Sequence, residues 1–374
     1  MDKLTSEEMR RFNRHQVYRL IYEKKKISRQ EIADTLQLSL PTVTLNLKSM
    51  EAEGLIFANG FFESTGGRKS VVYSCVTDRH IAIGVHIKKH KISIVSVNIY
   101  GEIMGRTQVM EEYMHDRDYY RSCGEHIRNF IQEENISSKQ ILGVGIALTA
   151  LLSRDRRSVK KSILLGTSET TIEDFEEWID YPCQLYHDSE AAANAELWFS
   201  PDIADAMYLG INQYLNGMLI MNGKVHAGRE FSGGVVEHLT LYPGGRTCYC
   251  GKKGCLTCYC SGHVLYSDET GARDQFFADL RSGDVEASRK WNEFISDMAI
   301  AIGSLYSVLD CDFILGGTVR AYMTEQDVER LQQLVRKDSH FAPTDDFIRL
   351  GHNDVEVCAR GAAISYIKEF VENL

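Results

Sequence analysis

Long apolar runs are missing from this 374-residue sequence. No segment approaches the roughly 20 consecutive apolar residues that a membrane-spanning helix requires, and the N-terminal residues contain no apolar core of a signal peptide. Ten cysteines without a secretory signal indicate a reducing compartment rather than a disulfide framework. The sequence therefore predicts a cytoplasmic protein with no membrane segment.

Proline is also scarce, with five residues, and no stretch rich in Pro, Gly or Ser marks a flexible linker. The length predicts two or three domains with sizeable cores. Charge is uneven: residues 1–75 carry 12 Lys or Arg against 9 Asp or Glu, whereas the remainder carries 30 against 43. A basic segment on an acidic body predicts that any polyanion binds the N-terminal segment. Chance is the alternative, because three of these lysines form the single run 24–26.

Three helices are predicted in the N-terminal segment. The first spans about Asn13 to Lys24, where apolar residues recur at helical spacing. Ser28 and Glu31 form a capping box at the start of a short second helix. Ser39 is suited to cap the third helix, with Pro41 in the first turn, where no amide partner is lost. A tight connection between the second and third helices is typical of helix-turn-helix proteins.

The third helix has the pattern of a DNA-recognition helix. Its apolar residues fall on one face at i, i+4 and i+7, so the opposite face is free to meet a partner. An exposed leucine there, Leu45, fits contact with thymine methyl groups or with a protein. The residues of this helix that are predicted to contact DNA are Ser39, Pro41, Thr42, Thr44, Leu45 and Lys48.

Two short predicted strands, 55–57 and 71–73, flank a glycine-containing tip at 63–69. This arrangement predicts a wing, and Arg68 and Lys69 are expected to reach a narrow minor groove, where the negative potential is enhanced. Helix, cap and basic tip together predict a winged helix-turn-helix that binds double-stranded DNA. The alternative is a winged helix that makes only protein contacts.

Three cysteines lie within eight positions, ten residues after a histidine and with two glycines between them. One imidazole and three thiolates are the usual ligands of a tetrahedral structural zinc site, and glycine permits the tight turns that aim several sulfurs at one ion. The predicted ligands are His238, Cys248, Cys250 and Cys255. A disulfide and unliganded buried thiols are the alternatives. Cys258 and Cys260 are surplus, either core residues or alternative ligands.

The same stretch carries a family resemblance. His238 followed by Cys248-x-Cys250-Gly251-x-x-Gly254-Cys255-Leu256 resembles the zinc signature of the ROK family of repressors, open reading frames and sugar kinases. The tip Thr65-Gly66-Gly67-Arg68 resembles the wing of the ROK repressors. The resemblance implies an α/β protein in which the winged helix precedes a two-lobed, actin-like (ribonuclease H-like) fold with a structural zinc site.

The alternation of predicted strands and helices from about residue 79 agrees with an α/β body. The expected domains are a DNA-binding domain at 1–78, a first lobe at 79–200 completed by a C-terminal helix at 356–374, and a second lobe with the zinc site at 201–355. In the resembled family the C-terminal helix packs back on the first lobe.

Sugar kinases of this type need a general base, glycine-rich phosphate loops and polar groups that bind the sugar. Asp188 matches the family's base, although capping the following helix is an alternative role, and the preceding sugar-binding Asn is His187 here. The first phosphate loop, Asp-x-Gly-Gly-Thr in the family, is His86-Ile87-Lys88-Lys89-His90, and the second, at 210–217, is also degraded. Without glycine the backbone amides cannot approach a phosphate closely. Phosphoryl transfer is therefore predicted to be lost, with Asp188 a vestigial base.

The sugar site departs from the family pattern as well. The family's Gly-Glu-x-Gly-His is Gly234-Val235-Val236-Glu237-His238 here, and the Glu after Gly-Cys-Leu is Thr257. Glu237 offers a shifted acid in place of the lost one. The resemblance implies an effector site formed by His187, Asp188, Glu237, His238 and Thr257.

Together these features predict a regulator rather than an enzyme. We expect a cytoplasmic repressor of sugar-metabolism genes that binds a double-stranded operator and responds to a sugar or sugar phosphate. A homodimer or homotetramer is expected, because dimers span two half-sites about one helical turn apart or a multiple of it. Effector binding would close the lobes and lower operator affinity. The alternatives are a DNA-tethered sugar kinase and a repressor controlled by a protein partner without a sugar effector.

Overall fold

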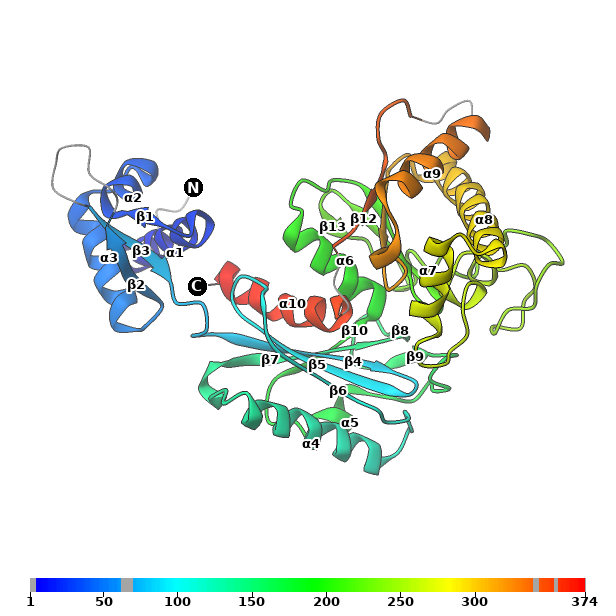
Figure 1. The fold of residues 1–374 in the computed structure, drawn as a ribbon. Coiled ribbons are helices and arrows are strands. Elements are labelled where there is room, and N and C mark those ends of the chain that lie inside the picture. Colours follow the sequence, from blue (N-terminus) through cyan, green and yellow to red (C-terminus); the bar gives the residue numbers. More distant parts are fainter. Residues whose placement is uncertain (1–4, 62–69, 339–342, 353–355, 374) are drawn as a thin grey trace.

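The computed structural model describes residues 5–61, 70–338, 343–352 and 356–373. The chain forms a winged helix followed by two α/β lobes (Figure 1). The expected domain boundaries stay a prediction; the last strand of the winged helix, β3, ends at Cys75 and the next strand, β4, begins at Ile81. Within the described residues, no helix is both long and apolar enough to span a membrane.

The winged helix combines three helices with a three-stranded antiparallel sheet in the order β1-β3-β2. Its elements are α1 (Ser6–Lys24), β1 (Ile27–Ser28), α2 (Arg29–Leu36), α3 (Leu40–Ala52), β2 (Ile56–Phe61) and β3 (Val71–Cys75). The two predicted caps are confirmed: Ser28 and Glu31 form a capping box, and the Ser39 side chain caps α3.

The first helix is longer than predicted. It begins at Ser6, well before the predicted start at Asn13, because Thr5 and Glu8 form a further capping box that satisfies its first amides. The predicted apolar face of the third helix is confirmed and consists of the buried residues Val43, Leu47 and Met50.

The first lobe is built on a five-stranded sheet in the order β10-β7-β4-β5-β6. Its strands are β4 (Ile81–Lys88), β5 (Lys91–Val97), β6 (Ile103–Val109), β7 (Ile141–Leu148) and β10 (Cys183–His187), with a small ribbon of β8 (Leu151–Leu152) and β9 (Val159–Lys161). Helices α4 (Arg117–Glu133) and α5 (Ile172–Glu176) lie on one face, and α10 (Val357–Asn373) covers the other (Figure 1). The expected return of the C-terminal helix to the first lobe is confirmed.

A second five-stranded sheet, in the order β13-β12-β11-β14-β15, forms the second lobe. Its strands are β11 (Ala206–Ile211), β12 (Leu215–Met221), β13 (Lys224–Val225), β14 (Asp312–Gly316) and β15 (Ile348–Leu350). The helices of this lobe are α7 (Ala272–Ser282), α8 (Val285–Leu309) and α9 (Glu325–Asp338). Short 3-10 helices are η1 (Ser138–Gln140), η2 (Leu256–Cys258), η3 (Gly262–Val264) and η4 (Arg320–Tyr322).

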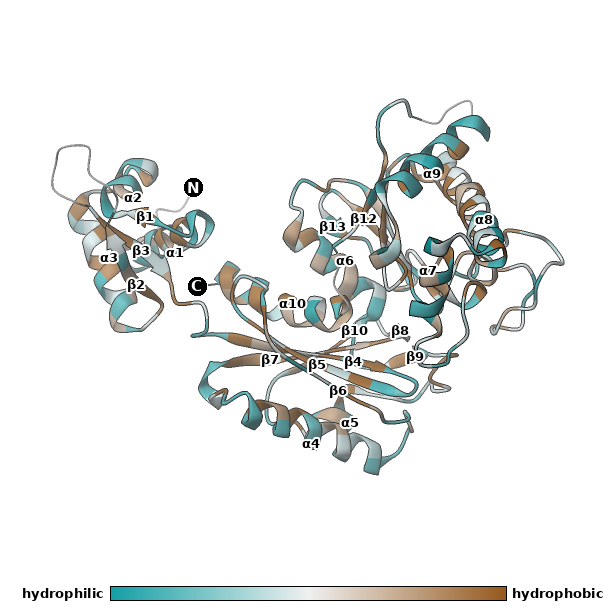
Figure 2. Cartoon of the chain, viewed as in Figure 1, coloured by the Kyte–Doolittle hydropathy of each residue, from teal (hydrophilic) through white to brown (hydrophobic). Residues whose placement is uncertain are grey.

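Figure 2 shows hydrophobic residues along the strands of the first-lobe sheet and hydrophilic ones along much of α4 and α9.

Two helices, α6 (Asp188–Phe199) and α10, pack together between the two sheets. Glycines permit their close approach: a Cβ on Gly84 of β4 or Gly145 of β7 would overlap the backbone of α10. A Cβ on Gly361 of α10 would overlap the carbonyl oxygen of Ala191 in α6. Because close-packed contacts leave no room for movement of one partner alone, α10 fixes α6 on the first lobe. The same helix α6 packs against β11, β12 and β13 of the second lobe.

The winged helix contacts the first lobe at the turn between β5 and β6. The rings of Tyr22 in α1 and Tyr100 in the turn stack with centroids 4.9 Å apart, and the Tyr22 hydroxyl donates to the Ile99 carbonyl oxygen at 2.9 Å. The Trp198 indole N–H donates to the Tyr100 carbonyl oxygen at 3.0 Å. One turn therefore joins the winged helix to the C-terminal end of α6.

Candidate DNA-binding face, metal centre and effector cleft

The predicted recognition helix, α3, exposes the face that is expected to meet DNA. The Leu45 side chain is 66% exposed, and Pro41 and Lys48 are exposed beside it. Thr44 is half-buried, and its hydroxyl donates to the Leu40 carbonyl oxygen at 2.7 Å. The exposed face therefore offers one apolar side chain and one cation, which fits contact with a base edge and a phosphate.

Two other predicted DNA contacts also stabilise the start of α3. The Ser39 hydroxyl accepts from the Thr42 amide at 3.3 Å, and the two hydroxyl oxygens lie 2.8 Å apart. A helix N-terminus presents unpaired amides and a partial positive charge, which suits a phosphate contact. Arg68 and Lys69 lie outside the described residues, so the wing contacts stay predictions.

The four predicted metal ligands come together in the second lobe. One ligand atom from each of His238, Cys248, Cys250 and Cys255 lies within 4.8 Å of every other. The Cys250 and Cys255 sulfurs are 3.7 Å apart, and Cys248 Sγ is 3.7 Å from His238 Nδ1. Disulfide sulfurs lie about 2.05 Å apart, whereas sulfurs about 2.3 Å from a tetrahedral ion lie about 3.8 Å apart. The spacing contradicts the disulfide alternative for this pair and fits a metal centre.

Two glycine turns bring these sulfurs together. Gly251 and Gly254 have positive φ angles of 87° and 82°, the left-handed conformation that a side chain disfavours. Of the surplus cysteines, Cys260 is fully buried in the second-lobe core. Cys258 lies outside the four-residue cluster, with its thiol 3.8 Å from the Thr247 carbonyl oxygen.

Asp188 lies at the start of α6, in a buried network. Its carboxylate accepts from the Thr149 hydroxyl and from the Ser189 amide, both at 2.7 Å, and lies 3.0 Å from His187 Nδ1. The alternative that Asp188 caps α6 is wrong, because His187 is the N-cap and Asp188 is already helical. The Asp188 carboxylate is therefore held by its neighbours rather than used as the helix cap.

Electrostatics favour an ionised Asp188. Burial opposes the charge, but the hydrogen bond and charge of His187 outweigh burial and hold the pKa of Asp188 well below its usual value. Burial likewise opposes the charged form of His187, yet the hydrogen bond and charge of Asp188 outweigh it and raise the pKa of His187. The two residues therefore form a buried ion pair, with Thr149 as a further donor.

Two polar groups near this pair have no hydrogen-bond partner among the described residues: His86 Nε2 and Glu237 Oε2, both buried. Burial, together with the charge of Lys88, lowers the pKa of His86 to about 3, so its imidazole is neutral at pH 7. Burial raises the pKa of Glu237 to about 7. A buried polar atom left unpaired costs about 1–3 kcal/mol. These two atoms are positions beside the Asp188 network where a ligand would gain hydrogen bonds.

Two predicted effector residues have structural contacts. The Thr257 hydroxyl accepts from the Leu215 amide at 3.1 Å, so it stabilises the start of β12. His238 is one of the four candidate metal ligands, and Glu237 directly precedes it in the sequence. The candidate metal site and the predicted effector site therefore share one loop. Sequence reasoning missed Thr149. Its only signal was its position directly after a buried strand, where ligands of parallel sheets gather.

The two segments that correspond to the family's phosphate loops form tight β-hairpins in this structure. In the first, Lys88 of β4 pairs with Lys91 of β5. In the second, Ile211 of β11 pairs with Leu215 of β12. Backbone amides cradle a phosphate only where glycine allows a close approach, so the geometry supports the predicted loss of both loops.

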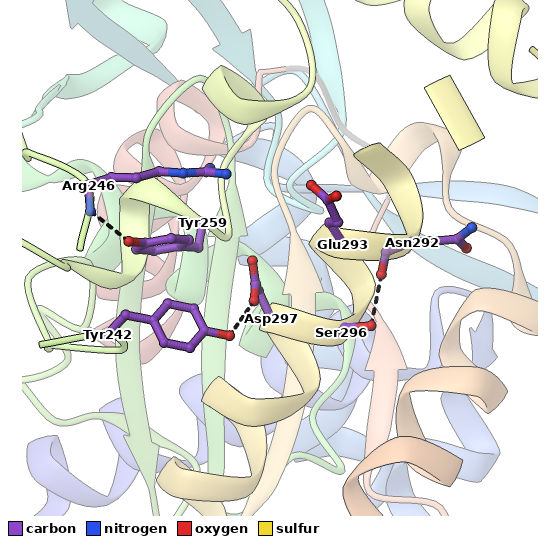
Figure 3. Close-up of a pocket in the computed structure, with 7 residues that line it drawn as sticks. All are labelled: Tyr242, Arg246, Tyr259, Asn292, Glu293, Ser296 and Asp297. Atoms are coloured by element: carbon purple, nitrogen blue, oxygen red, sulfur yellow. Dashed lines mark hydrogen bonds between the residues drawn. The ribbon is translucent and has the colours of Figure 1, made fainter. Parts of the chain in front are cut away.

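A surface hollow of the second lobe involves none of these cleft residues (Figure 3). The Tyr242 hydroxyl donates to Asp297 of α8 at 2.6 Å, and the Tyr259 hydroxyl accepts from the Arg246 amide at 2.7 Å. The Arg246 guanidinium also lies 4.8 Å from the centre of the Tyr259 ring. The Tyr242–Asp297 bond attaches the segment around the candidate metal ligands to α8, and the Arg246–Tyr259 contacts lie within that segment.

Comparison with known families agrees with this architecture. The ROK family model matches residues 82–368, and a winged helix-turn-helix DNA-binding model matches residues 13–56. The xylose repressor of Caldicellulosiruptor bescii is 22% identical over 357 residues, which cover 89% of this chain and 90% of the relative. The DNA-binding transcriptional dual regulator NagC of Escherichia coli is 27% identical over 256 residues, 66% of this chain and 62% of NagC.

Solved structures share the fold. A ROK family transcriptional regulator, a homologue of the E. coli Mlc protein, matches with a TM-score of 0.76 at 19% identity, over 98% of this chain and 97% of that one. A ROK family glucokinase from Streptomyces griseus matches with a TM-score of 0.65 at 20% identity, over 76% of this chain and 98% of the glucokinase. With most of its length matched by the family model, this chain belongs to the ROK family and joins the two-lobed ROK fold to an N-terminal winged helix-turn-helix.

Proposed function

We propose that this protein is a sequence-specific DNA-binding regulator, a repressor of sugar-metabolism genes, whose two-lobed domain senses an effector and has no kinase activity. The observation that carries the proposal is the exposed α3 face around Leu45 on a winged helix attached to a cleft with unpartnered polar atoms. The repressors among the relatives support it. The kinases among the structural matches make a DNA-tethered kinase the competing proposal.

The proposed coupling between cleft and DNA runs through α6. Asp188 begins this helix in the cleft, and Trp198 near its other end donates to the turn that carries Tyr100. Tyr100 in turn stacks on Tyr22 of the winged helix. Because α10 fixes α6 on the first lobe, closure of the lobes around an effector would move α6, the Tyr100 turn and the winged helix together relative to the second lobe. Operator affinity would fall because two recognition helices must match two half-sites.

Further contacts tie α6 to both lobes. Glu196 in the last turn of α6 accepts from the amide and from Nδ1 of His352, each at 2.9 Å, beyond β15 of the second lobe. At the winged-helix end, Arg360 of α10 donates to the Gly101 carbonyl oxygen at 2.6 Å and lies 4.1 Å from the centre of the Phe199 ring. Relative motion of the lobes would therefore act directly on α6.

We place the effector, a sugar or sugar phosphate, beside His187, Asp188 and Glu237, and add His86 to the predicted set. A buried carboxylate and a neutral imidazole can accept and donate hydrogen bonds to sugar hydroxyls. His238 and Thr257 act indirectly in this proposal, through the metal centre and the start of β12.

The metal centre is proposed to hold a structural zinc ion, because one imidazole and three thiolates form a closed tetrahedral site. Its role is to fix the loop that carries Glu237 at the cleft, since Glu237 is bonded to the ligand His238. A homodimer or homotetramer supplies the two recognition helices that a two-half-site operator needs.

The first prediction separates base contact from phosphate contact on α3. Leu45→Ala should reduce the preference for a thymine in a selected operator by roughly 1–3 kcal/mol, the usual cost of one mismatched base pair. Lys48→Ala should weaken binding on all sequences and make the salt dependence shallower by about one unit of slope. Arg68→Ala should weaken sites with A·T-rich flanks most, because their minor groove is narrow.

The measurement is a binding titration of each variant on the selected operator and on single-base changes, at two salt concentrations. Lys337→Ala, an exposed lysine at the end of α9, is the matched control and should leave the slope unchanged. If Leu45→Ala and Arg68→Ala both keep the parent's affinity and selectivity, α3 and the wing do not contact DNA as proposed.

The second prediction tests the junction without an effector. Tyr22→Ala removes the stacking on Tyr100 and the bond to Ile99, so the winged helix loses its fixed orientation. Affinity for a two-half-site operator should fall by roughly tenfold or more, because a loosened domain lowers the effective concentration of the second half-site. Affinity for a single half-site should stay unchanged. Phe12→Ala, a 52% exposed aromatic on the same helix, is the control; equal losses on both operators would contradict the role of the junction.

The third prediction concerns the metal. Purified protein should contain one zinc per chain, and Cys250→Ser should lose it together with thermal stability, because binding energy of a structural zinc is folding energy. Cys258→Ser should keep the zinc, since its sulfur lies outside the cluster. Elemental analysis and thermal unfolding measure both. Loss of zinc from Cys258→Ser, or a zinc-free parent that is fully folded, would contradict the assigned ligand set.

The fourth prediction is that no aldose is phosphorylated. Lys88 and Lys89 occupy positions where phosphate-binding glycines are expected, so ATP phosphates lack a backbone cradle. A coupled assay with ATP, Mg²⁺ and a panel of hexoses and pentoses should give the same background for the parent and for Asp188→Asn. Turnover by the parent that Asp188→Asn abolishes would support the DNA-tethered kinase instead.

A further inference from the structure

Two lysines of the first lobe lie on the same sheet face as the unpartnered His86. His86 and Lys88 are two residues apart on β4, so their side chains lie on the same face of the sheet. Lys91 of β5 is the direct partner of Lys88 in the antiparallel pair, which puts both lysines on that face. The charge of Arg273, near the start of α7 in the second lobe, also contributes to lowering the pKa of Lys91.

The direction of α10 shows that this helix does not extend over the face at the lysines. Gly84, two residues before His86, contacts Ala359 near the start of α10, whereas Gly143 on the neighbouring strand contacts Tyr366 further along the helix. The helix therefore runs antiparallel to β4 and begins at the C-terminal ends of the strands. Beyond its first turn the same face continues with His86 and Lys88, at the edge where parallel strands bind ligands.

Glu356 is the carboxylate whose charge acts on Lys91, and it does so without a direct ion pair. Among the described residues, Lys88 and Lys91 form no ion pair with a carboxylate; Lys91 donates to Gln108 at 3.2 Å, and Gln108 donates to Glu356. Burial lowers the pKa of Lys91, and so do the charges of Lys88 and Arg273, against the opposing effect of Glu356. The lysine is thus held in a half-buried position beside two other cations, which is unfavourable until an anion binds.

Arg273 has its own local contacts. It lies 3.4 Å from Asp274, which also accepts from the Tyr322 hydroxyl, and its guanidinium lies 5.6 Å from the centre of the Tyr322 ring. These contacts orient the guanidinium, and the Arg273 side chain remains 38% exposed. The guanidinium therefore keeps donors for a ligand.

We propose that the effector is a phosphorylated small molecule, whose phosphate is bound between the lobes by Lys88 and Lys91 of the first lobe, Arg273 of the second, and His86. The proposal rests on the proposed function of the cleft as an effector site. The unpartnered His86 Nε2 supplies a hydrogen-bonding position at the base of the group, and the long basic side chains replace the glycine amides of a phosphate loop.

This arrangement couples the anion to closure of the lobes. Without a bound anion, the cations on the two lobes repel each other and favour an open arrangement of the lobes. A phosphate dianion between them attracts both sides, so its binding free energy is larger in the closed form, which is the condition for a ligand to shift a conformational equilibrium. A neutral sugar would leave the repulsion in place.

The experiment is calorimetric titration of the full-length protein with inorganic phosphate, a panel of aldose phosphates and the matching free aldoses, in chloride at constant ionic strength. At least one aldose phosphate should bind more tightly than both its free aldose and inorganic phosphate. Lys88→Gln and Arg273→Gln should each weaken it by roughly tenfold or more, the effect of losing one charged contact of about 1.4 kcal/mol. Lys89→Gln, at the exposed hairpin tip, is the matched control and should bind like the parent.

The unliganded variants give a second measurement. Lys88→Gln and Arg273→Gln should unfold at the same temperature as the parent or higher, because each relieves repulsion. If no aldose phosphate binds, if the free aldose binds as tightly, or if the two variants bind like Lys89→Gln, the proposed anion site is wrong. DNA binding is measured separately, so phosphate binding without operator binding would contradict the regulator function and leave the anion site standing.

Discussion

The close contact of α10 with the first-lobe sheet on one side and with α6 on the other is the constraint on which the rest of the structure depends. Backbone touches backbone at Gly84, Gly145 and Gly361, where a single added carbon would overlap a neighbouring main chain. Such contacts cannot yield gradually, because close-packed interiors resist deformation. They fix the start of α6 in the cleft and its end at the winged helix, so cleft and DNA-binding domain share one rigid helix.

The start of that helix carries Asp188, which matches the base of the ROK sugar kinases, whereas the two hairpins differ in sequence from the phosphate loops of those kinases. Asp188 is buried, ionised and held by Thr149 and His187. The backbone cradles for nucleotide phosphates are replaced by side chains, with Lys88 and Lys91 at the first hairpin. A site with a preserved carboxylate but no nucleotide cradle can bind a ligand without transferring a phosphoryl group, and the binding free energy is then available for a conformational change.

The metal cluster and the winged-helix junction connect this cleft to the rest of the molecule. Glu237 faces the Asp188 network and directly precedes the cluster residue His238, so the position of the acid depends on the loop that the sulfurs organise. At the opposite end of α6, one turn contacts both Trp198 and the Tyr22 ring. A displacement between the lobes would therefore reach the recognition helix through few intermediate contacts.

Local sequence patterns determined much of the winged helix and of the candidate metal site. The cap at Ser39 and the buried face of α3 follow from short-range spacing, and the cysteine spacing indicates the His/Cys cluster. Only the tertiary structure decided which polar atoms stay unpaired, that His187 rather than Asp188 caps α6, and that Thr149 completes the carboxylate network. Sequence encodes contacts between neighbours in the chain, whereas these depend on how two sheets and the helices between them are placed in space.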